Sequence, residues 1–194
     1  MIRLKDGMLL YHGSYTSIPN IDLGRCVGGV DFGRGFYLTS SYEQAYQYVQ
    51  LSVRKAKHVG SVQSDFDSDD GQISVYKFHY DPNLLSYCFQ DAGAEWLPFV
   101  AGNRKVDLFP ELLRKYSTID IIGGKIADDQ TARTLQIYIS GEVFGKPGTS
   151  EADKAAIKQL LPNRLKDQFC FRTQEAVDHL EFIRSDRYGD IKSK

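Results

Sequence analysis

The sequence has few of the residues that mark disulfide-rich or zinc-binding proteins. Its three cysteines, Cys26, Cys88 and Cys170, are odd in number, widely spaced and in no C-x-x-C pair. Neither a disulfide framework nor a zinc site is therefore expected, and we expect no bound metal. Each cysteine is instead expected to serve as a small buried hydrophobic side chain.

Long hydrophobic runs and a leader segment are also absent from the pattern. The longest apolar stretches, such as residues 8–11, have only about four residues, whereas roughly 18 are needed to span a bilayer. Residues 1–7 carry charge, but neither an apolar region of signal-peptide length nor a small-residue cleavage site follows them. The sequence predicts a soluble protein without membrane contact, in the cytoplasm by default.

An excess of charge of one sign is lacking as well. Lys and Arg total 24 against 25 for Asp and Glu, a net charge of -1, which disfavours a nucleic-acid surface over the whole molecule but permits a local one. Aromatic residues, in contrast, are plentiful, with 12 Tyr, 11 Phe and 1 Trp. The tyrosines predict pocket walls that are apolar yet carry hydroxyl groups able to form hydrogen bonds. At 194 residues the chain fits one domain over residues 1–194, given roughly 150 residues per domain.

Short apolar runs between turn residues predict an α+β fold without internal repeats. Strands are expected at residues 8–12, 35–39, 73–80, 119–122 and 169–172, and helices at 42–58, 128–140 and 151–161. A last helix is expected after Thr173, with Ala176, Val177 and Leu180 on one face. The core should span about residues 8–183.

Several local signals refine these boundaries. Ser41 and Gln44 resemble a capping box at the start of the helix at 42–58. Asp128 or Asp129 is expected to cap the helix at 128–140, and Pro98 to break or start a helix within residues 94–101. The acidic, turn-rich segment 61–72 predicts a mobile loop, and the polar segment 185–194 a frayed tail. One face of the helix at 42–58 should consist of Ala45, Tyr48, Val49 and Val53.

Three short segments combine residue types that carry chemistry. The first is Tyr11-His12-Gly13-Ser14, at the end of an apolar strand. The second, residues 31–39, reads Asp-Phe-Gly-Arg-Gly-Phe-Tyr-Leu-Thr, and its G-x-G precedes a strand rather than a helix, which disfavours a kinase or Rossmann phosphate loop. The third, residues 167–169, places Gln168 at the start of a strand that leads into a helix.

In order and spacing, the first two segments resemble motifs of ADP-ribosyltransferases of the diphtheria-toxin-like and poly(ADP-ribose) polymerase clan. Within the clan, the chain is most similar to a bacterial domain family of unknown function that shares the Asp-Phe-Gly-x-Gly-Phe-Tyr-Leu-Thr core. Residues 95–96, 103–104 and 167–168 also recur there. The resemblance spans residues 8–183 and implies a split mixed β-sheet core with surrounding helices, with NAD bound as a substrate.

The resemblance also implies roles for individual residues. His12 would bond the adenosine-side ribose of NAD, and the backbone of Gly13 would hold the nicotinamide carboxamide. Tyr37 and Tyr48 would cover the two faces of the nicotinamide ring. Ala45 stands where a serine often contacts the carboxamide, which would weaken affinity for nicotinamide. The implied catalytic residues are His12, Tyr37 and Gln168, and the implied NAD-binding residues are His12, Gly13, Ser14, Gly33, Arg34, Tyr37, Ala45 and Tyr48.

Gln168 departs from the clan, which usually has a glutamate at this position. A Gln carbonyl can accept a hydrogen bond from the ribose 2'-OH, but it cannot act as a base. Poly(ADP-ribose) synthesis is therefore disfavoured, while transfer of one ADP-ribose unit remains open. Asp167 or Glu175 could supply a carboxylate, although strand alternation turns Asp167 away from Gln168. An engineered replacement of glutamate at this position is a further alternative.

The remaining candidates for contact with the pyrophosphate or the acceptor are cations and one acid. Arg34, Arg104 and Lys105 suit the first role. Asp31 is expected to cap its loop, with orientation of the acceptor as the alternative.

The leading functional hypothesis is an NAD-dependent mono-ADP-ribosyltransferase that modifies a macromolecule, with protein favoured slightly over nucleic acid as the acceptor. The resemblance implies a toxin of a bacterial toxin-antitoxin or defence system, with an antitoxin protein as a partner. Two alternatives stay open: a non-catalytic module that binds NAD or ADP-ribose, favoured by Gln168, and an NAD glycohydrolase.

Overall fold

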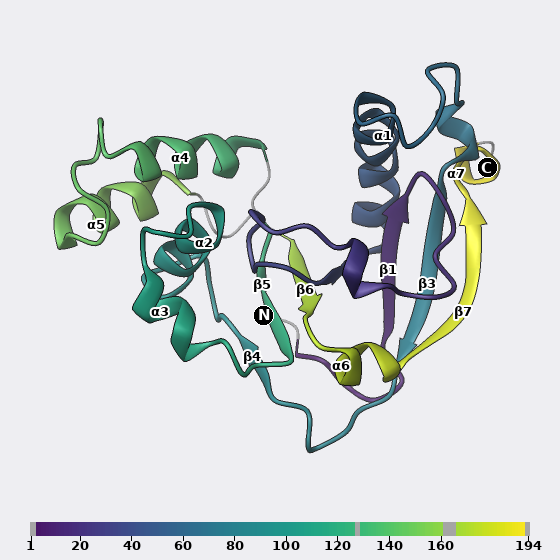
Figure 1. Cartoon of the computed structure of the whole chain (residues 1–194), viewed down its shortest axis with the longest axis horizontal. Coiled ribbons are helices and arrows are strands. Elements are labelled where there is room, and N and C mark those ends of the chain that lie inside the picture. The colour runs from purple at the N-terminus through teal and green to yellow at the C-terminus, as the bar shows by residue number, and fades with distance from the viewer. Residues whose placement is uncertain (1–2, 127–128, 161–165, 193–194) are drawn as a thin grey trace. The chain divides into compact units, whose positions relative to one another are not determined.

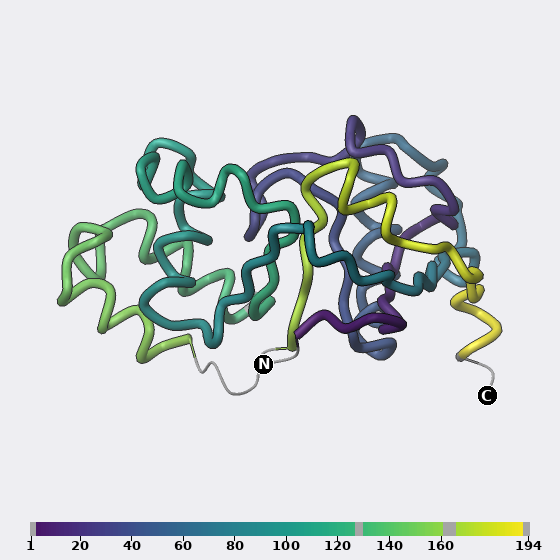
Figure 2. The backbone as a smooth tube through the Cα atoms, turned by 90° about the horizontal axis from the view of Figure 1, so that it is seen from below, coloured from purple at the N-terminus to yellow at the C-terminus, as the bar shows by residue number. Residues whose placement is uncertain are grey.

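The computed structural model describes residues 3–126, 129–160 and 166–192, which form an α+β fold, as the sequence predicts. The chain divides into two compact units, each assembled from separated segments. Unit 1 comprises Met1–Arg3, Leu23–Phe36 and Pro82–Ala176. Unit 2 comprises Leu4–Asp22, Tyr37–Asp81 and Val177–Lys194, and the passages between the units can be followed by colour in Figures 1 and 2. A single domain over residues 1–194 stays a prediction.

Unit 2 contains a three-stranded antiparallel sheet in the order β1-β3-β7 (Figure 1). Its strands are β1 (Leu9–Ser14), β3 (Gln72–Phe78) and β7 (Leu180–Arg187). Helix α1 (Tyr42–His58) packs on this sheet through small and β-branched side chains, since bulkier ones would hold the helix away from the strands. The buried side chains of α1 are Ala45, Val49, Val53 and Ala56.

The bounds of α1 agree with the sequence prediction. The Ser41 hydroxyl accepts from the backbone N–H of Gln44 at 3.2 Å, which satisfies one of the first N–H groups of the helix. The second half of the expected capping box differs, because the Thr39 hydroxyl both accepts from the Ser41 N–H and donates to the Gln44 side chain. Tyr48 was expected on the apolar face of α1, but its side chain is exposed, so the expectation that it belongs to that face is wrong.

The second sheet has four strands in the order β2-β6-β5-β4. Its strands β4 and β5 are parallel and β5 and β6 antiparallel, so the sheet is mixed. The chain leaves unit 1 within β2, after Phe36. The strands are β2 (Phe36–Leu38), β4 (Ser86–Cys88), β5 (Ile121–Lys125) and β6 (Asp167–Phe171).

Aromatic side chains form the core of unit 1. Phe32, Phe89 and Phe99 lie within ring contact of one another, and the indole N–H of the fully buried Trp96 donates to the Lys125 carbonyl at 3.0 Å. Gly124 leaves room for these rings, because a Cβ there would meet Phe32. Among the described residues from 96 to 178, the helices are α2 (Trp96–Arg104), α3 (Pro110–Lys115), α4 (Asp129–Ser140), α5 (Ser150–Gln159) and α6 (Gln174–Asp178).

Three of the expected boundaries have a visible physical cause. Pro98 lies in the first turn of α2, where its missing N–H has no intrahelical partner to lose. Thr149 caps α5, and Thr173 accepts from the backbone N–H of Ala176 at 3.2 Å, as predicted for the start of α6. Asp128 as a cap and Leu161 as a helix end lie outside the described residues.

The expectation for the end of the chain is wrong over the described residues. Leu180 belongs to β7 rather than to the helix after Thr173, and the segment expected to be a frayed tail continues β7 and then forms α7 (Tyr188–Lys192). Tyr188 is 4% exposed, because it packs against the α1 residues of the unit 2 core. Its ring stacks on Tyr46 at a centroid distance of 4.5 Å.

Two smaller expectations also need correction. Only Cys170 is buried, whereas Cys26 and Cys88 are half-buried. Within the acidic segment expected to be a loop, η2 (Ser68–Asp70) forms a short 3-10 helix, and Asp70 pairs with Arg187 at 2.6 Å. The mobility of that segment stays a prediction.

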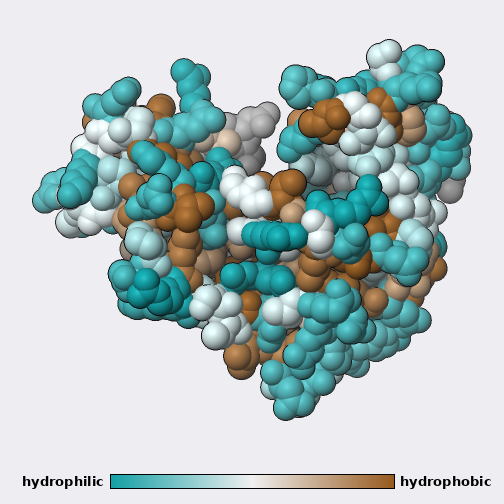
Figure 3. Space-filling model, viewed as in Figure 1, coloured by the Kyte–Doolittle hydropathy of each residue, from teal (hydrophilic) through white to brown (hydrophobic). Residues whose placement is uncertain are grey.

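The helices and the exposed side chains of the described residues bear on contact with a membrane. None of the helices there combines the length and the apolar character needed to cross a bilayer. Exposed apolar side chains such as Val27, Val59 and Val143 come from separate parts of the sequence, and the face drawn in Figure 3 shows hydrophobic residues interspersed with hydrophilic ones. Such scattered residues are ordinary on protein surfaces.

Candidate functional site

Gly13 has no side chain because α1 leaves no space for one. A Cβ on Gly13 would overlap the carbonyl of Ala45 and lie 3.3 Å from Val49. Ala45 is itself buried, so the small residues at positions 13 and 45 together allow β1 and α1 to approach closely. The resemblance implies that the backbone of Gly13 contacts nicotinamide, which stays a prediction, and packing against α1 gives a separate reason for glycine at this position.

The backbone of Gly13 faces the outer edge of β1. Along an antiparallel strand the N–H and C=O of successive residues point alternately to the two sides. Tyr11 exchanges both of its bonds with Thr39, at 2.9 and 3.0 Å, on the side away from β3. Gly13, two residues later, therefore presents its N–H and C=O on that same side, and among the described residues neither group has a hydrogen-bond partner. Position 13 can thus hold a planar group that both accepts and donates, such as a primary amide.

The ring of His12 is fixed by the backbone of β2. Its Nδ1 lies 2.8 Å from the carbonyl oxygen of Tyr37. Because a carbonyl can only accept, Nδ1 carries the proton and donates. Packing that removes the imidazole from water lowers the pKa of His12 below its ordinary value of 6.5, against the opposing effect of the bond to Tyr37. The ring is therefore neutral at pH 7, and its Nε2 is restricted to accepting hydrogen bonds, for instance from a hydroxyl.

The other predicted residues of unit 2 lie on β1, β2 and α1. Ser14 is buried at the end of β1, and Tyr37 is half-buried in the middle of β2. Tyr48 is exposed on α1, where the Lys55 ammonium donates to its hydroxyl at 3.2 Å and lies 5.4 Å from its ring centroid. No described contact joins Tyr48 to Tyr37. Their stacking on a common ring stays a prediction.

The glycine segment of unit 1 is shaped by close packing. Gly33 has a φ of +79°, a conformation that favours glycine, and a Cβ there would meet the side chain of Asn103. A Cβ on Gly35 would lie 2.6 Å from the Phe171 carbonyl oxygen, so β6 leaves no room for one. Between them, the Arg34 guanidinium donates to the carbonyls of Leu23 and Gly24 at 3.0 to 3.3 Å. Arg34 is exposed and pairs with no carboxylate of the described residues, so its charge is available for an anion.

Asp31, Arg104 and Gln168 form a buried hydrogen-bonded group. The Arg104 guanidinium donates to Oδ1 of Asp31 at 2.6 and 2.9 Å, and the Gln168 amide nitrogen donates to Oδ2 at 3.0 Å. Asp31 and Gln168 are each 7% exposed, although 137 residues separate them in the sequence. All three residues are candidates from the sequence, but nothing in the sequence connects them. The Asp31 carboxylate thus binds two side chains of unit 1, and its role as a loop cap stays a prediction.

The other acids near Gln168 in the sequence lie in different surroundings. Asp167 pairs with Lys125 on β5 at 2.9 Å, consistent with strand alternation turning it away from Gln168. Glu175 is exposed in the first turn of α6, and Lys105 is exposed just after α2. Among the described residues, no group of three or more His, Cys, Asp or Glu side chains is placed to hold a metal ion.

Sequence comparison assigns the chain to a family. Residues 8–182 match the family model described as a protein of unknown function (DUF3990). The chain belongs to the DUF3990 family. The match contains all three chemistry-bearing segments, so the Gly13 edge and the Asp31, Arg104 and Gln168 group both lie within the DUF3990 region. Searches of the curated proteins and of the solved structures found no match.

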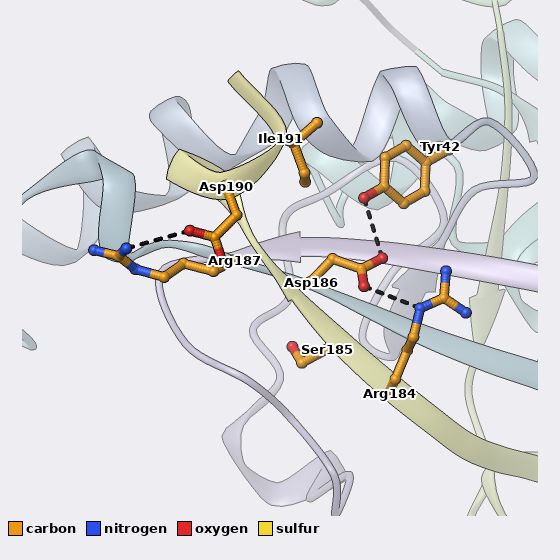
Figure 4. A pocket seen from close by; sticks show the side chains of 7 residues that line it. All are labelled: Tyr42, Arg184, Ser185, Asp186, Arg187, Asp190 and Ile191. Carbon is orange, nitrogen blue, oxygen red and sulfur yellow. Dashed lines mark hydrogen bonds and ion pairs between the residues drawn. The ribbon is translucent and has the colours of Figure 1, made fainter. Parts of the chain in front are cut away.

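Sequence analysis missed a hollow of about 430 Å³ in unit 2 of the DUF3990 chain (Figure 4). Its charges are paired: Arg184 with Asp186 at 2.9 Å, and Arg187 with Asp70 and Asp190. Burial and the neighbouring Asp186, to which Tyr42 donates, raise the pKa of Tyr42 to about 12. Because the ion pairs balance, this hollow offers no excess charge for a phosphate group. The lining residues are Tyr42, Arg184, Ser185, Asp186, Arg187, Asp190 and Ile191.

Proposed function

We propose that this DUF3990 protein is an NAD-dependent mono-ADP-ribosyltransferase that acts on a macromolecular acceptor. The observation that carries the proposal is the outer edge of β1 at Gly13, with both backbone groups available to a primary amide. Nicotinamide carries such an amide, which can accept from the Gly13 N–H and donate to its C=O. The resemblance of residues 11–14 and 31–39 to the ADP-ribosyltransferase motifs independently supports this assignment.

Other residues of the chain support recognition of the rest of NAD. The neutral His12 ring accepts a ribose hydroxyl at Nε2, since its Nδ1 proton is directed to Tyr37. The exposed Arg34 cation suits the pyrophosphate. Tyr37 supplies an aromatic face to the nicotinamide ring, with Tyr48 as the second aromatic side chain.

The proposed reaction breaks the bond between ribose C1' and the nicotinamide nitrogen. The electron pair of that bond leaves with nicotinamide, positive charge develops on C1' and the ring oxygen, and the acceptor nucleophile forms the new bond at C1' while its proton passes to solvent water. The carbonyl oxygen of Gln168 accepts a hydrogen bond from the ribose 2'-OH, but the amide cannot take up the proton that the nucleophile loses. We therefore propose transfer of a single ADP-ribose unit rather than chain extension.

A single labelling experiment tests the transferase proposal. The purified protein is incubated with adenine-labelled NAD and a bacterial lysate, and both nicotinamide release and label in the protein and nucleic-acid fractions are followed. Label in either fraction that is lost in Tyr37→Ala, but kept in Tyr80→Ala, supports transfer, because Tyr80 is an exposed tyrosine in no proposed contact. Nicotinamide release without label in either fraction indicates an NAD glycohydrolase.

The second candidate function is a module that binds NAD without turnover. The amide at position 168 favours it, since an amide neither accepts a proton nor offsets positive charge. Calorimetric binding of NAD without any nicotinamide release would support this function and contradict the transferase. The cytoplasmic location, the toxin role and an antitoxin partner are further proposals. Expression in a bacterial host tests the toxin role: growth should slow with the native protein and recover with Tyr37→Ala.

A further inference from the structure

We propose that Asp31 is a positioning residue that orients the Gln168 amide, so that the Gln168 carbonyl oxygen faces a hydroxyl of the substrate. The inference rests on the proposed function, because the hydroxyl is the 2'-OH of the nicotinamide ribose. It assigns to Asp31 and Gln168 together the place of the single glutamate that the clan usually has.

Hydrogen-bond chemistry fixes the direction of the amide. An ionised carboxylate only accepts, so the Gln168 group that lies 3.0 Å from Oδ2 of Asp31 is the NH2 group. The amide is planar, and its carbonyl oxygen Oε1 therefore points away from Asp31. Without Asp31, the two ends of the amide could exchange places by rotation of the side chain.

Oε1 remains able to accept from a substrate. It has no hydrogen-bond partner among the described residues. The Gln168 residue is only 7% exposed, but its Oε1 is not one of the described unpartnered atoms that are sealed from solvent. A substrate hydroxyl can therefore reach Oε1. A buried amide with one end fixed and the other end reachable is suited to bind one hydroxyl in a defined direction.

Arg104 completes the arrangement. It donates twice to Oδ1 of Asp31, at 2.6 and 2.9 Å, which leaves Oδ2 for Gln168 and compensates the charge of the buried carboxylate. The order of donors and acceptors from Arg104 through Asp31 to Gln168 thus allows an amide at position 168 and disfavours a carboxylate there. The NH2 group of Gln168 satisfies the Asp31 carboxylate, which argues against an engineered replacement of glutamate at position 168.

The same order predicts the outcome of exchanging the two functional groups. In Gln168→Glu alone, two carboxylates meet at hydrogen-bond distance and repel. In Asp31→Asn alone, the new amide loses the charge that faces Arg104 and turns its NH2 group toward Gln168, so the Gln168 amide turns its carbonyl oxygen to position 31 and away from the substrate. In the double variant D31N/Q168E, the amide at position 31 can accept from Arg104 and donate to the carboxylate at position 168, so hydrogen bonding among these three side chains is restored.

The test is a double-mutant cycle with two readouts. Each single variant should lower Tm by about 5 °C through the loss of a buried charge-assisted bond, and the double variant should lie within about 2 °C of the native protein. Nicotinamide release should show kcat reduced about 100-fold in Asp31→Asn, with a smaller change in KM, and recovery in D31N/Q168E, because the misdirected acceptor acts mainly on the reacting geometry. Asp153→Asn is the matched control, since Asp153 accepts from Tyr138 and no described contact joins it to Gln168.

The outcomes separate this inference from the proposed function. Tm losses that simply add in the double variant, or a native kcat in a folded Asp31→Asn protein, would overturn the inference while leaving the transferase in place. The inference is supported if the Tm losses of Asp31→Asn and Gln168→Glu are non-additive and kcat recovers in the double variant. The control cycle of Asp153→Asn with Gln168→Glu should then show additive losses. A native protein that neither binds nor cleaves NAD would overturn both.

Discussion

Nδ1 of His12 lies 2.8 Å from the carbonyl oxygen of Tyr37, 25 residues further along the chain. This bond joins two motifs that sequence analysis treated as separate, and it sets the tautomer of the imidazole. It also places a titratable ring where water has limited access, which makes the effect of pH on His12 predictable.

We expect the free energy of unfolding to fall below about pH 6.5 because His12 must take up a proton. Burial lowers the pKa of His12 in the folded state, so the unfolded chain binds the proton more readily. The His12 contribution is fully present above the unfolded value of 6.5 and is lost as pH falls through the folded pKa. Urea unfolding of the native protein and of His12→Asn between pH 5 and 8 measures it. Asn keeps a donor near the Nδ1 position without titrating, so an identical pH slope in both proteins would contradict the prediction.

Gly13→Ala should destabilise the protein strongly. The new methyl group would overlap the Ala45 carbonyl, and β1 and α1 would have to move apart, at a cost of about 3 kcal/mol. Gly28→Ala is the matched control, because a Cβ there has no atom within 4 Å, and its effect should stay within about 0.5 kcal/mol. Chemical unfolding of the two variants gives the comparison. Equal stability of both would show that α1 does not press on Gly13.

The Gly13 edge should distinguish an amide from a carboxylate. Nicotinamide can accept from the N–H and donate to the C=O of Gly13, whereas nicotinate has no donor and would place negative charge against the carbonyl oxygen. We expect NAD to bind at least about 10-fold more tightly than its nicotinic-acid counterpart, on the scale of 1–3 kcal/mol for an unsatisfied polar group. Calorimetry with both dinucleotides provides the measurement. Equal affinities would place the nicotinamide end elsewhere.

Tyr188→Ala should lower the free energy of unfolding by about 3–5 kcal/mol, the usual cost of removing a large buried aromatic side chain. Tyr188 is 4% exposed, stacks on Tyr46 and accepts from the Gln50 side chain at 2.7 Å. Tyr80→Ala serves as control, because Tyr80 is 58% exposed, and should cost less than about 0.5 kcal/mol. Urea denaturation distinguishes the two. A small loss in Tyr188→Ala would mean that α7 contributes little to the core.

Local sequence signals predicted the elements whose causes are local. The cap at Ser41 and the apolar spacing of α1 gave both ends of that helix, and Thr173 gave the start of α6. Strand β7 escaped prediction because it lies at the edge of its sheet with most side chains at least partly exposed, so its sequence is as polar as a tail. Tyr188 was a large aromatic residue within that supposed tail, and its presence there was the available signal.

The candidate site residues likewise differ in whether their neighbours are close in the sequence. Gly13 and His12 follow from a motif of adjacent residues, and their neighbourhood could be predicted. The bond between Asp31 and Gln168 could not, because the partners are 137 residues apart and nothing near either one specifies the other. The available signal was an amide at a position where the ADP-ribosyltransferases that the chain resembles usually have a glutamate.

The order of the strands along the chain has a consequence for biosynthesis. Strand β6 lies between β2 and β5, and β7 pairs along the whole of β3, so neither sheet can be completed until residues 167–187 have left the ribosome. Contacts of such long sequence separation form slowly and late. A nascent chain therefore carries Gly13 and Asp31 long before it can assemble the hydrogen-bonded group around Gln168, which forms only when β6 has joined its sheet.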